Sequence, residues 1–177
     1  MQSQEKIEPG NIKIGVVGAG SWGTALANLL ASKGFSIDWW VFEKEVIHQI
    51  QSSGENQFFL PDIKLSANLK PHNELAAVVS GKDLLLLVVP SHVLRDTALK
   101  MADHVSEKTV VASASKGIEN KTHLTMTGVL QESLPQVPAE HLAVISGPSF
   151  AREVAMNLPT VVTAASRDQD VAALVQQ

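Results

Sequence analysis

The chain has 177 residues, of which 45% are hydrophobic, so it is long enough and apolar enough to bury one ordinary core. Its formal net charge is −4 and its lysines and arginines are scattered, which argues against nucleic acid or an anionic membrane as a partner. The absence of cysteine excludes a disulfide framework and thiolate metal sites, and it fits a reducing compartment. We therefore expect one compact unit with no nucleic-acid partner and no membrane partner.

The first ten residues, MQSQEKIEPG, are polar and acidic, whereas a secretion signal would be basic and then apolar. We interpret residues 1–10 as a flexible leader of a cytoplasmic protein. The longest apolar run, residues 84–89, is far too short to cross a bilayer, and it is expected to form a buried strand.

The first predicted strand and turn occupy residues 12–23, IKIGVVGAGSWG. A β-branched run leads into Gly18, Gly20 and Gly23, and a helix is expected over residues 24–33. In a strand–turn–helix unit, the first glycine of G-x-G-x-x-G permits the turn, the second lets the backbone approach a pyrophosphate, and the third lets the helix pack closely. The free amides and dipole at the helix N-terminus also favour a diphosphate. The alternative is a tight strand-to-helix connection without a ligand.

A second strand is predicted over residues 37–41, and it ends at Phe42 and Glu43. Glu43 lies 20 residues beyond Gly23, near the place where an acidic side chain would accept hydrogen bonds from the adenosine ribose and repel a 2′-phosphate. An equal alternative is that Glu43 is a solvated residue at the start of the next helix.

Strands and helices alternate along the rest of the chain. Ser91 is expected to cap the helix that follows it, and Phe58 and Phe59 are expected to plug a crevice. The alternation predicts an α/β fold with a doubly wound, mostly parallel sheet of the Rossmann type, in which ligands lie at the carboxyl ends of the strands. The expected helices cover residues 45–51, 74–80, 91–105, 122–134, 149–156 and 168–175, and the expected strands cover residues 64–69, 83–89, 109–114, 141–145 and 160–165.

Two segments at predicted strand ends carry candidate chemistry. Lys116 stands between small residues, as a cation aimed at an anionic or carbonyl oxygen would, although a solvated turn lysine is the alternative. Ser149 is expected near the N-cap of a helix, with its hydroxyl and free amides facing the cleft, although a simple capping turn would have the same sequence. The six histidines show no i, i+4 pairing, so no metal site is expected.

Several segments resemble the NAD(P)-dependent sn-glycerol-3-phosphate dehydrogenases: GAGSWGTALA at 18–27, VVPSH at 88–92, SKGIE at 115–119, SGPSFAREVA at 146–155 and LPT at 158–160. The resemblance implies hydride transfer between a nicotinamide and C2 of glycerol 3-phosphate or dihydroxyacetone phosphate, in support of glycerophospholipid synthesis. It implies substrate roles for Lys116, Gly147 and Ser149. The residues implied to bind the cofactor are Gly18, Gly20, Ser21, Trp22, Gly23, Phe42, Lys116 and Ala151.

The resemblance also bears on which cofactor is used. Many bacterial members of the family have Arg or His at the position of Phe42, whereas this chain combines Phe42 with Glu43. Loss of the cation beside a carboxylate should disfavour a 2′-phosphate. We therefore expect NAD to be preferred, with NADP as the second possibility.

The family carries an all-helical C-terminal domain that supplies a general-acid lysine and the groups that hold the substrate phosphate. No such segment follows Gln177 here, so we expect residues 11–177 to be a dinucleotide-binding domain that is inactive alone and dimerises, if at all, through the missing domain. Two alternatives stay open: a non-catalytic dinucleotide sensor or scaffold, and another Rossmann dehydrogenase of the β-hydroxyacid or 6-phosphogluconate type.

Overall fold

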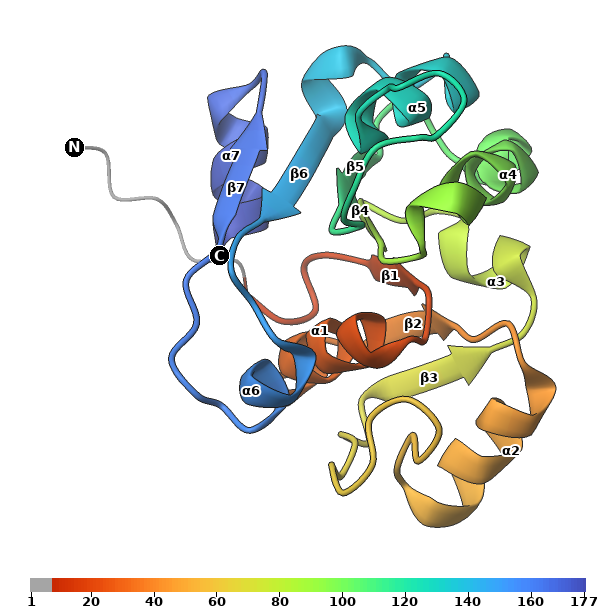
Figure 1. Ribbon diagram of the computed structural model, residues 1–177, viewed down its shortest axis with the longest axis vertical. Coiled ribbons are helices and arrows are strands. Elements are labelled where there is room, and N and C mark those ends of the chain that lie inside the picture. Colours follow the sequence, from red (N-terminus) through yellow and green to blue (C-terminus); the bar gives the residue numbers. More distant parts are fainter. Residues whose placement is uncertain (1–7) are drawn as a thin grey trace.

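The computed structural model describes residues 8–177, so most of the predicted leader lies outside the described residues. Strands and helices alternate as the sequence predicts (Figure 1). The strands are β1 (Ile14–Val17), β2 (Ile37–Trp40), β3 (Leu69–His72), β4 (Leu84–Leu87), β5 (Val110–Ser113), β6 (Leu142–Ser146) and β7 (Thr163–Ser166). The helices are α1 (Ser21–Ser32), α2 (Lys44–Ser53), α3 (Leu75–Val79), α4 (Ser91–Met101), α5 (Met126–Ser133), α6 (Ala151–Ala155) and α7 (Gln169–Gln176), with 3-10 turns at Ala102–His104 and Ala139–His141.

The strands form one sheet in the order β3-β2-β1-β4-β5-β6-β7. The first six strands are parallel, and β7 pairs antiparallel with β6. Val17 is in register with Trp40 on one side and Leu87 on the other, so the carboxyl ends of the central strands reach the same edge. The winding direction reverses between β1 and β4, which is where doubly wound folds bind their ligands. The predicted fold class is confirmed.

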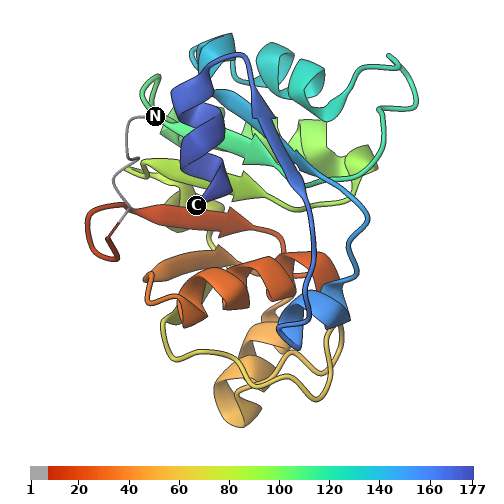
Figure 2. The same ribbon diagram turned by 90° about the vertical axis from the view of Figure 1, so that its left-hand side faces the viewer.

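The helices cover both faces of the sheet, because alternate residues of each strand point to opposite sides. Val16 and Trp39 are buried against α1, α2 and α7, whereas Val17 and Leu85 are buried against α3, α4 and α5. Figure 2 shows α1 and α7 on the same side of the sheet. This double coverage explains why the central strands are almost entirely apolar. None of the helices within residues 8–177 combines the length and the apolar character that a membrane crossing needs.

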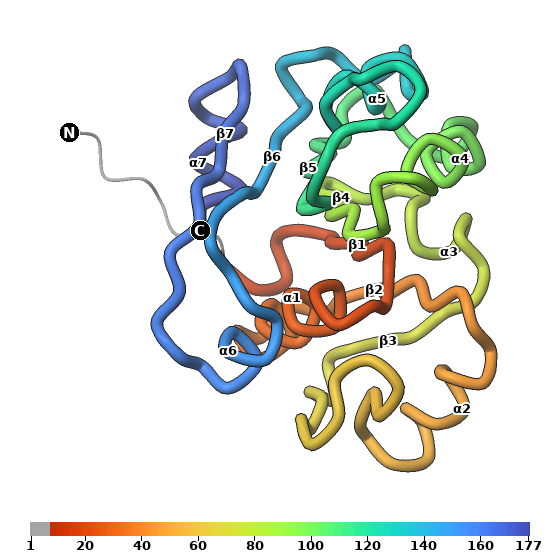
Figure 3. The backbone as a smooth tube through the Cα atoms, viewed as in Figure 1, coloured from red at the N-terminus to blue at the C-terminus, as the bar shows by residue number. Residues whose placement is uncertain are grey.

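The strand predicted over residues 64–69 is wrong, because residues 54–68 form an irregular segment and β3 begins at Leu69 (Figure 3). The Asn28 side chain donates to the Lys64 carbonyl and accepts from the Ser66 amide, so the segment is held against α1 instead of pairing with the sheet. β3 itself contains Pro71, which is tolerated because this strand lies at the edge of the sheet.

Several helix starts differ from the predicted ones. Helix α1 begins three residues earlier, at Ser21, because the Thr24 amide already bonds to the Gly20 carbonyl. Helix α5 begins later, at Met126, because the Thr125 side chain caps it by accepting from the Gly128 amide.

One predicted cap is wrong. The residue at the N-cap of α4 is Pro90, so Ser91 is the first helical residue and its side chain does not cap the helix. Ser149 lies next to the N-cap of α6, as predicted: the N-cap residue is Phe150, and the Ser149 hydroxyl donates to the Gly147 carbonyl at 3.4 Å.

Candidate functional site

The glycine turn between β1 and α1 has the sterics that its spacing predicts. Gly18 has a φ of +120°, and a Cβ at that position would lie 2.4 Å from the Val88 carbonyl oxygen. A Cβ on Gly23 would lie 2.3 Å from the Gly18 carbonyl oxygen, so the helix packs directly on the turn. A Cβ on Gly20 would meet nothing within 4 Å. Gly18 and Gly23 are therefore required by packing, whereas the space over Gly20 is free for a ligand.

The first turn of α1 presents donors to that space. No hydrogen bond within residues 8–177 engages the amides of Gly20, Ser21 or Trp22, and Gly20 is exposed. Unpaired amides and the positive end of the dipole of a twelve-residue helix bind anions. The residues present therefore fit a diphosphate at this point.

Two cavities meet at the turn. One, of about 400 Å³, lies toward β2, and the other, of about 370 Å³, lies toward β5. Both are lined by Gly20 and by Val88, Val89 and Pro90 at the end of β4. A molecule with two arms joined by a diphosphate could therefore rest on Gly20 with one arm in each cavity.

The cavity toward β2 contains the predicted adenosine-binding residues. Phe42 is 67% exposed and meets the Trp40 ring edge-on, with the ring centroids 5.8 Å apart. Glu43 lines the same cavity from the N-cap position of α2, where its side chain makes no capping bond. Both interpretations of Glu43 are thus compatible with its place. Phe59 also lines this cavity, whereas Phe58 lies over a groove along α2, so only one of the two predicted plugs reaches the site.

The cavity toward β5 brings together Trp22, Lys116, Ser149 and Ala151. The Lys116 ammonium donates to the Ser149 carbonyl at 3.2 Å and lies 5.8 Å from the centre of the Trp22 ring. Trp22 is half-buried in the first turn of α1 and packs against the core. Gly147 lines neither cavity, because its backbone packs against residues 161–162.

An ion-pair cluster holds the loop that carries Lys116. Arg95 of α4 donates to both carboxylate oxygens of Glu119 at 2.8 Å and also bonds to Glu132. The hydrogen bond from Arg95, together with one from Thr122, lowers the pKa of Glu119 to about 2. The loop that presents Lys116 is therefore tied to two helices.

Sequence reasoning missed the polar groups beneath the glycine turn. Asn56 is completely buried, and its side-chain amide donates to the Ala19 carbonyl at 2.9 Å and to the Thr24 hydroxyl at 2.8 Å. The Trp39 indole donates to the Gly18 carbonyl at 2.9 Å. Asn56 stands in a polar run that the sequence marks only as a loop, so no local signal pointed to it.

Residues 8–177 contain no group of three or more His, Cys, Asp or Glu side chains arranged to hold a metal ion. The site can therefore be described from its amides, its apolar walls and the charged side chains that line it, which are Lys116 in the cavity toward β5 and Glu43, Asp96 and Lys100 in the cavity toward β2.

The family described as "NAD-dependent glycerol-3-phosphate dehydrogenase N-terminus" matches residues 13–172 of this chain. The glycerol-3-phosphate dehydrogenase [NAD(P)+] of Syntrophobacter fumaroxidans is 48% identical over 170 residues, covering 96% of this chain and 50% of the relative. The enzyme of the same name from Geobacter metallireducens is 47% identical over 165 residues, covering 93% and 49%. The crystal structure of glycerol-3-phosphate dehydrogenase from Coxiella burnetii superposes with a TM-score of 0.85 at 37% identity, covering 93% of this chain and 49% of that one. The chain thus spans about half the length of the curated relatives it matches.

Proposed function

This chain belongs to the NAD-dependent glycerol-3-phosphate dehydrogenase family, and from that membership we propose that it is the cofactor-binding domain of such an oxidoreductase. The proposed reaction moves a hydride between NAD(P)H and dihydroxyacetone phosphate or sn-glycerol 3-phosphate. The observation that carries the proposal is the glycine turn, whose one sterically open glycine, Gly20, lies where two cavities meet. A nicotinamide bound there would supply the hydride in its reduced form and accept it in its oxidised form.

Different residues of the chain would bind the ligand in each of the two cavities. The amides of Ser21 and Trp22 bind the diphosphate at the N-terminus of α1. Phe42 offers its exposed ring to the adenosine arm. Lys116 places a positive charge in the other cavity, where it can orient an anionic or carbonyl oxygen of the substrate. Ser149 shares that cavity, and Ala151 lines its wall.

We propose that NAD is preferred over NADP. The support is the place of Glu43, which lines the cavity beside Phe42 and would repel a 2′-phosphate there. The relatives carry both cofactors in their names, so the preference belongs to this chain's own residues and not to the family.

We propose that a second, helical domain completes the substrate site and provides any homodimer contact. The chain spans about half the length of its relatives, and a run of apolar side chains after β6 is exposed. A general acid and a phosphate clamp on the second domain would leave residues 1–177 able to bind the dinucleotide but unable to turn over. The exposed side chains are Phe150, Met156, Leu158, Val161 and Val162.

A cytoplasmic enzyme without a nucleic-acid partner is also part of the proposal. The formal net charge of −4 with scattered basic residues supports the absence of a nucleic-acid partner, and a chain without cysteine fits a reducing compartment. The sensor or scaffold alternative is not favoured, because the relatives are named as dehydrogenases.

The test is a titration of NADH into the purified 177-residue chain, followed by calorimetry, with ADP as competitor. We expect saturable binding that ADP displaces, and no NADH oxidation after addition of dihydroxyacetone phosphate. A chain that does not bind NADH would contradict the cofactor role. Steady turnover by the chain alone would contradict the two-domain part of the proposal and leave the cofactor role intact.

A further inference from the structure

Three successive carbonyl groups of the glycine turn each accept a hydrogen bond within the protein. The Gly18 oxygen accepts from the Trp39 indole at 2.9 Å, and the Gly20 oxygen accepts from the Thr24 amide at 2.9 Å. Between them, the Ala19 oxygen accepts from the Thr24 hydroxyl at 3.1 Å and from the Asn56 side-chain amide at 2.9 Å. Ala19 is therefore held by two side chains, one of which comes from a distant loop.

The direction of the Ala19 carbonyl decides the direction of the next amide. In a planar trans peptide, the C=O of one residue and the N–H of the following residue point in opposite directions. With the Ala19 oxygen turned inward, the Gly20 N–H faces the open space above the turn. If this peptide plane rotated, a carbonyl oxygen would face an incoming phosphate in place of a donor, and the two would repel.

The hydrogen bonds of the buried Asn56 side chain are all made to the glycine turn, to Thr24 and to Phe59. Its two amide hydrogens serve the Ala19 oxygen and the Thr24 hydroxyl, and its carbonyl oxygen accepts from the Phe59 amide at 3.3 Å. Every polar atom of this completely buried side chain is thus used, either on the turn or on the residue that lines the β2-side cavity. In addition, the Ser21 hydroxyl donates to the Phe59 carbonyl at 2.5 Å.

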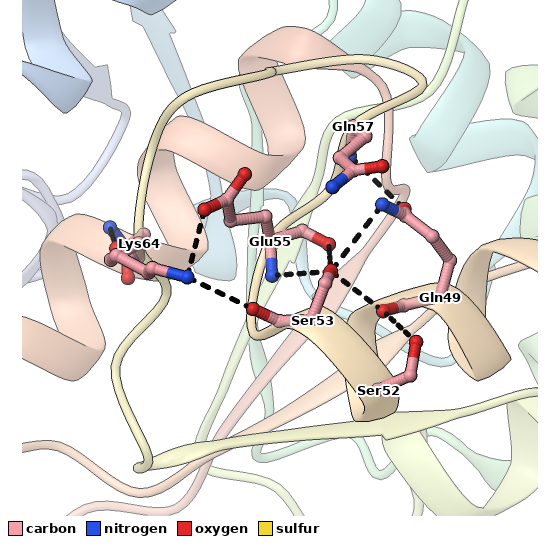
Figure 4. A network of polar contacts seen from close by, with 7 residues as sticks. Gln49, Ser52, Ser53, Glu55, Gln57 and Lys64 are labelled. Carbon is pink, nitrogen blue, oxygen red and sulfur yellow. Dashed lines mark hydrogen bonds and ion pairs between the residues drawn. The ribbon is translucent and has the colours of Figure 1, made fainter.

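The segment that carries Asn56 is fixed from its outer side. Lys64 bonds to the Glu55 carboxylate at 2.9 Å and to the Ser53 carbonyl at 3.1 Å, and the Gln57 amide donates to the Gln49 side chain at 3.0 Å (Figure 4). These contacts hold both neighbours of Asn56 against the end of α2. Its amide therefore reaches the turn from a segment that is tied to the end of α2.

We propose that Asn56 is a positioning residue for the anion-binding turn: together with Thr24 it holds the Ala19 carbonyl inward, so that the Gly20 amide points at the ligand's diphosphate. The inference rests on the proposed function, because it presupposes that the turn binds a dinucleotide. It adds the segment 55–62 to the residues that shape the site, and this segment lies outside the G-x-G-x-x-G motif.

The test compares Asn56→Ala with Asn28→Ala in the purified chain. Asn28 is a matched control, because it is also buried and ties the same irregular segment to α1, but through Lys64 and Ser66 and not through the turn. Both variants should lose thermal stability. Only Asn56→Ala should weaken binding of NADH and of ADP. The expected loss of affinity is about tenfold, the effect of removing one hydrogen bond to a buried group. Adenosine, which has no diphosphate, should bind both variants as it binds the wild type.

Two other outcomes count against the inference alone, and a third counts against the proposed function as well. Equal NADH affinity in Asn56→Ala and Asn28→Ala would overturn the inference and leave the proposed function standing. An equal loss for adenosine would show a general structural role and would also overturn it. A wild-type chain that does not bind NADH would refute the proposed function and the inference with it. If Asn56→Ala does not fold, Thr24→Val, which removes one donor to Ala19 while keeping the side-chain shape, decides by the same criteria.

Discussion

Substituting Gly20 with alanine should separate ligand binding from folding. Gly20 has φ −64° and ψ 177°, a backbone conformation open to any L-residue, and its added Cβ would meet nothing within 4 Å. Alanine removes conformational entropy from the unfolded chain, which stabilises by roughly 0.4–1 kcal/mol. It is also a poorer N-cap residue than glycine by a similar amount, roughly 0.5–1 kcal/mol. The two effects offset each other, so the free energy of unfolding should stay within about 1 kcal/mol of the wild type.

The same methyl group occupies the space in which the diphosphate would lie. Moving the diphosphate away by the radius of a methyl group would break its hydrogen bonds to the amides of the first turn of α1. If two such bonds to a charged group are lost, at about 1.5 kcal/mol each, the affinity falls by about 3 kcal/mol, or more than roughly 100-fold.

Calorimetric titration with NADH measures the affinity, and chemical denaturation measures the free energy of unfolding. Gly23→Ala is the opposite control, because its Cβ would lie 2.3 Å from the Gly18 carbonyl oxygen and should destabilise the fold itself. Wild-type affinity in Gly20→Ala would refute the placement of the diphosphate over Gly20. A large loss of stability in that variant would refute the claim that the space is open.

Two further predictions concern residues that line the site, and a third concerns the ion pair that holds the Lys116 loop. Lys116→Met should weaken NADH binding roughly fivefold, which is about 1 kcal/mol for an exposed charge, and should leave the melting temperature unchanged. Lys121→Met, in the same exposed loop, should change neither the NADH affinity nor the melting temperature. Equal effects of the two substitutions on NADH affinity would contradict the placement of Lys116. Glu43→Gln should raise the affinity for NADPH relative to NADH by roughly fivefold, about 1 kcal/mol for removal of one like charge, and an unchanged ratio would remove Glu43 from cofactor selection. Arg95 lowers the pKa of Glu119 to about 2 from an ordinary 4.5, so the paired carboxylate stabilises the fold above pH 4.5 and loses that contribution as the pH falls toward 2. The difference in free energy of unfolding between wild type and Glu119→Gln should therefore shrink over this pH range. A difference that is independent of pH would count against the ion pair.

The sequence determined the parts of this protein whose contacts are short in range. A β-branched run followed by glycines at fixed spacing and a periodic helix encodes the β1–α1 unit, because the turn, the close packing and the free amides all lie within about ten residues of chain. The alternation of apolar strands and amphipathic helices similarly predicted the doubly wound sheet, because the spacing of apolar residues in a strand or helix indicates which of its faces is buried. Lys116 and Ser149 were also selected from their places at predicted strand ends, and both line the cavity toward β5, whereas their roles there stay predictions.

Only the tertiary structure decided what supports that unit. Asn56 meets Ala19 and Thr24 across 37 and 32 residues of chain, and neither local propensity nor periodicity contains information about such a contact. For the same reason the predicted strand over residues 64–69 was wrong. Ser66 and Asn68 in this segment make hydrogen bonds to α1, and the strand that pairs with β2 begins only at Leu69. Local sequence specifies which backbone conformations are available, whereas long-range hydrogen bonds to buried groups select among them, because such groups cannot be left unpaired in the interior.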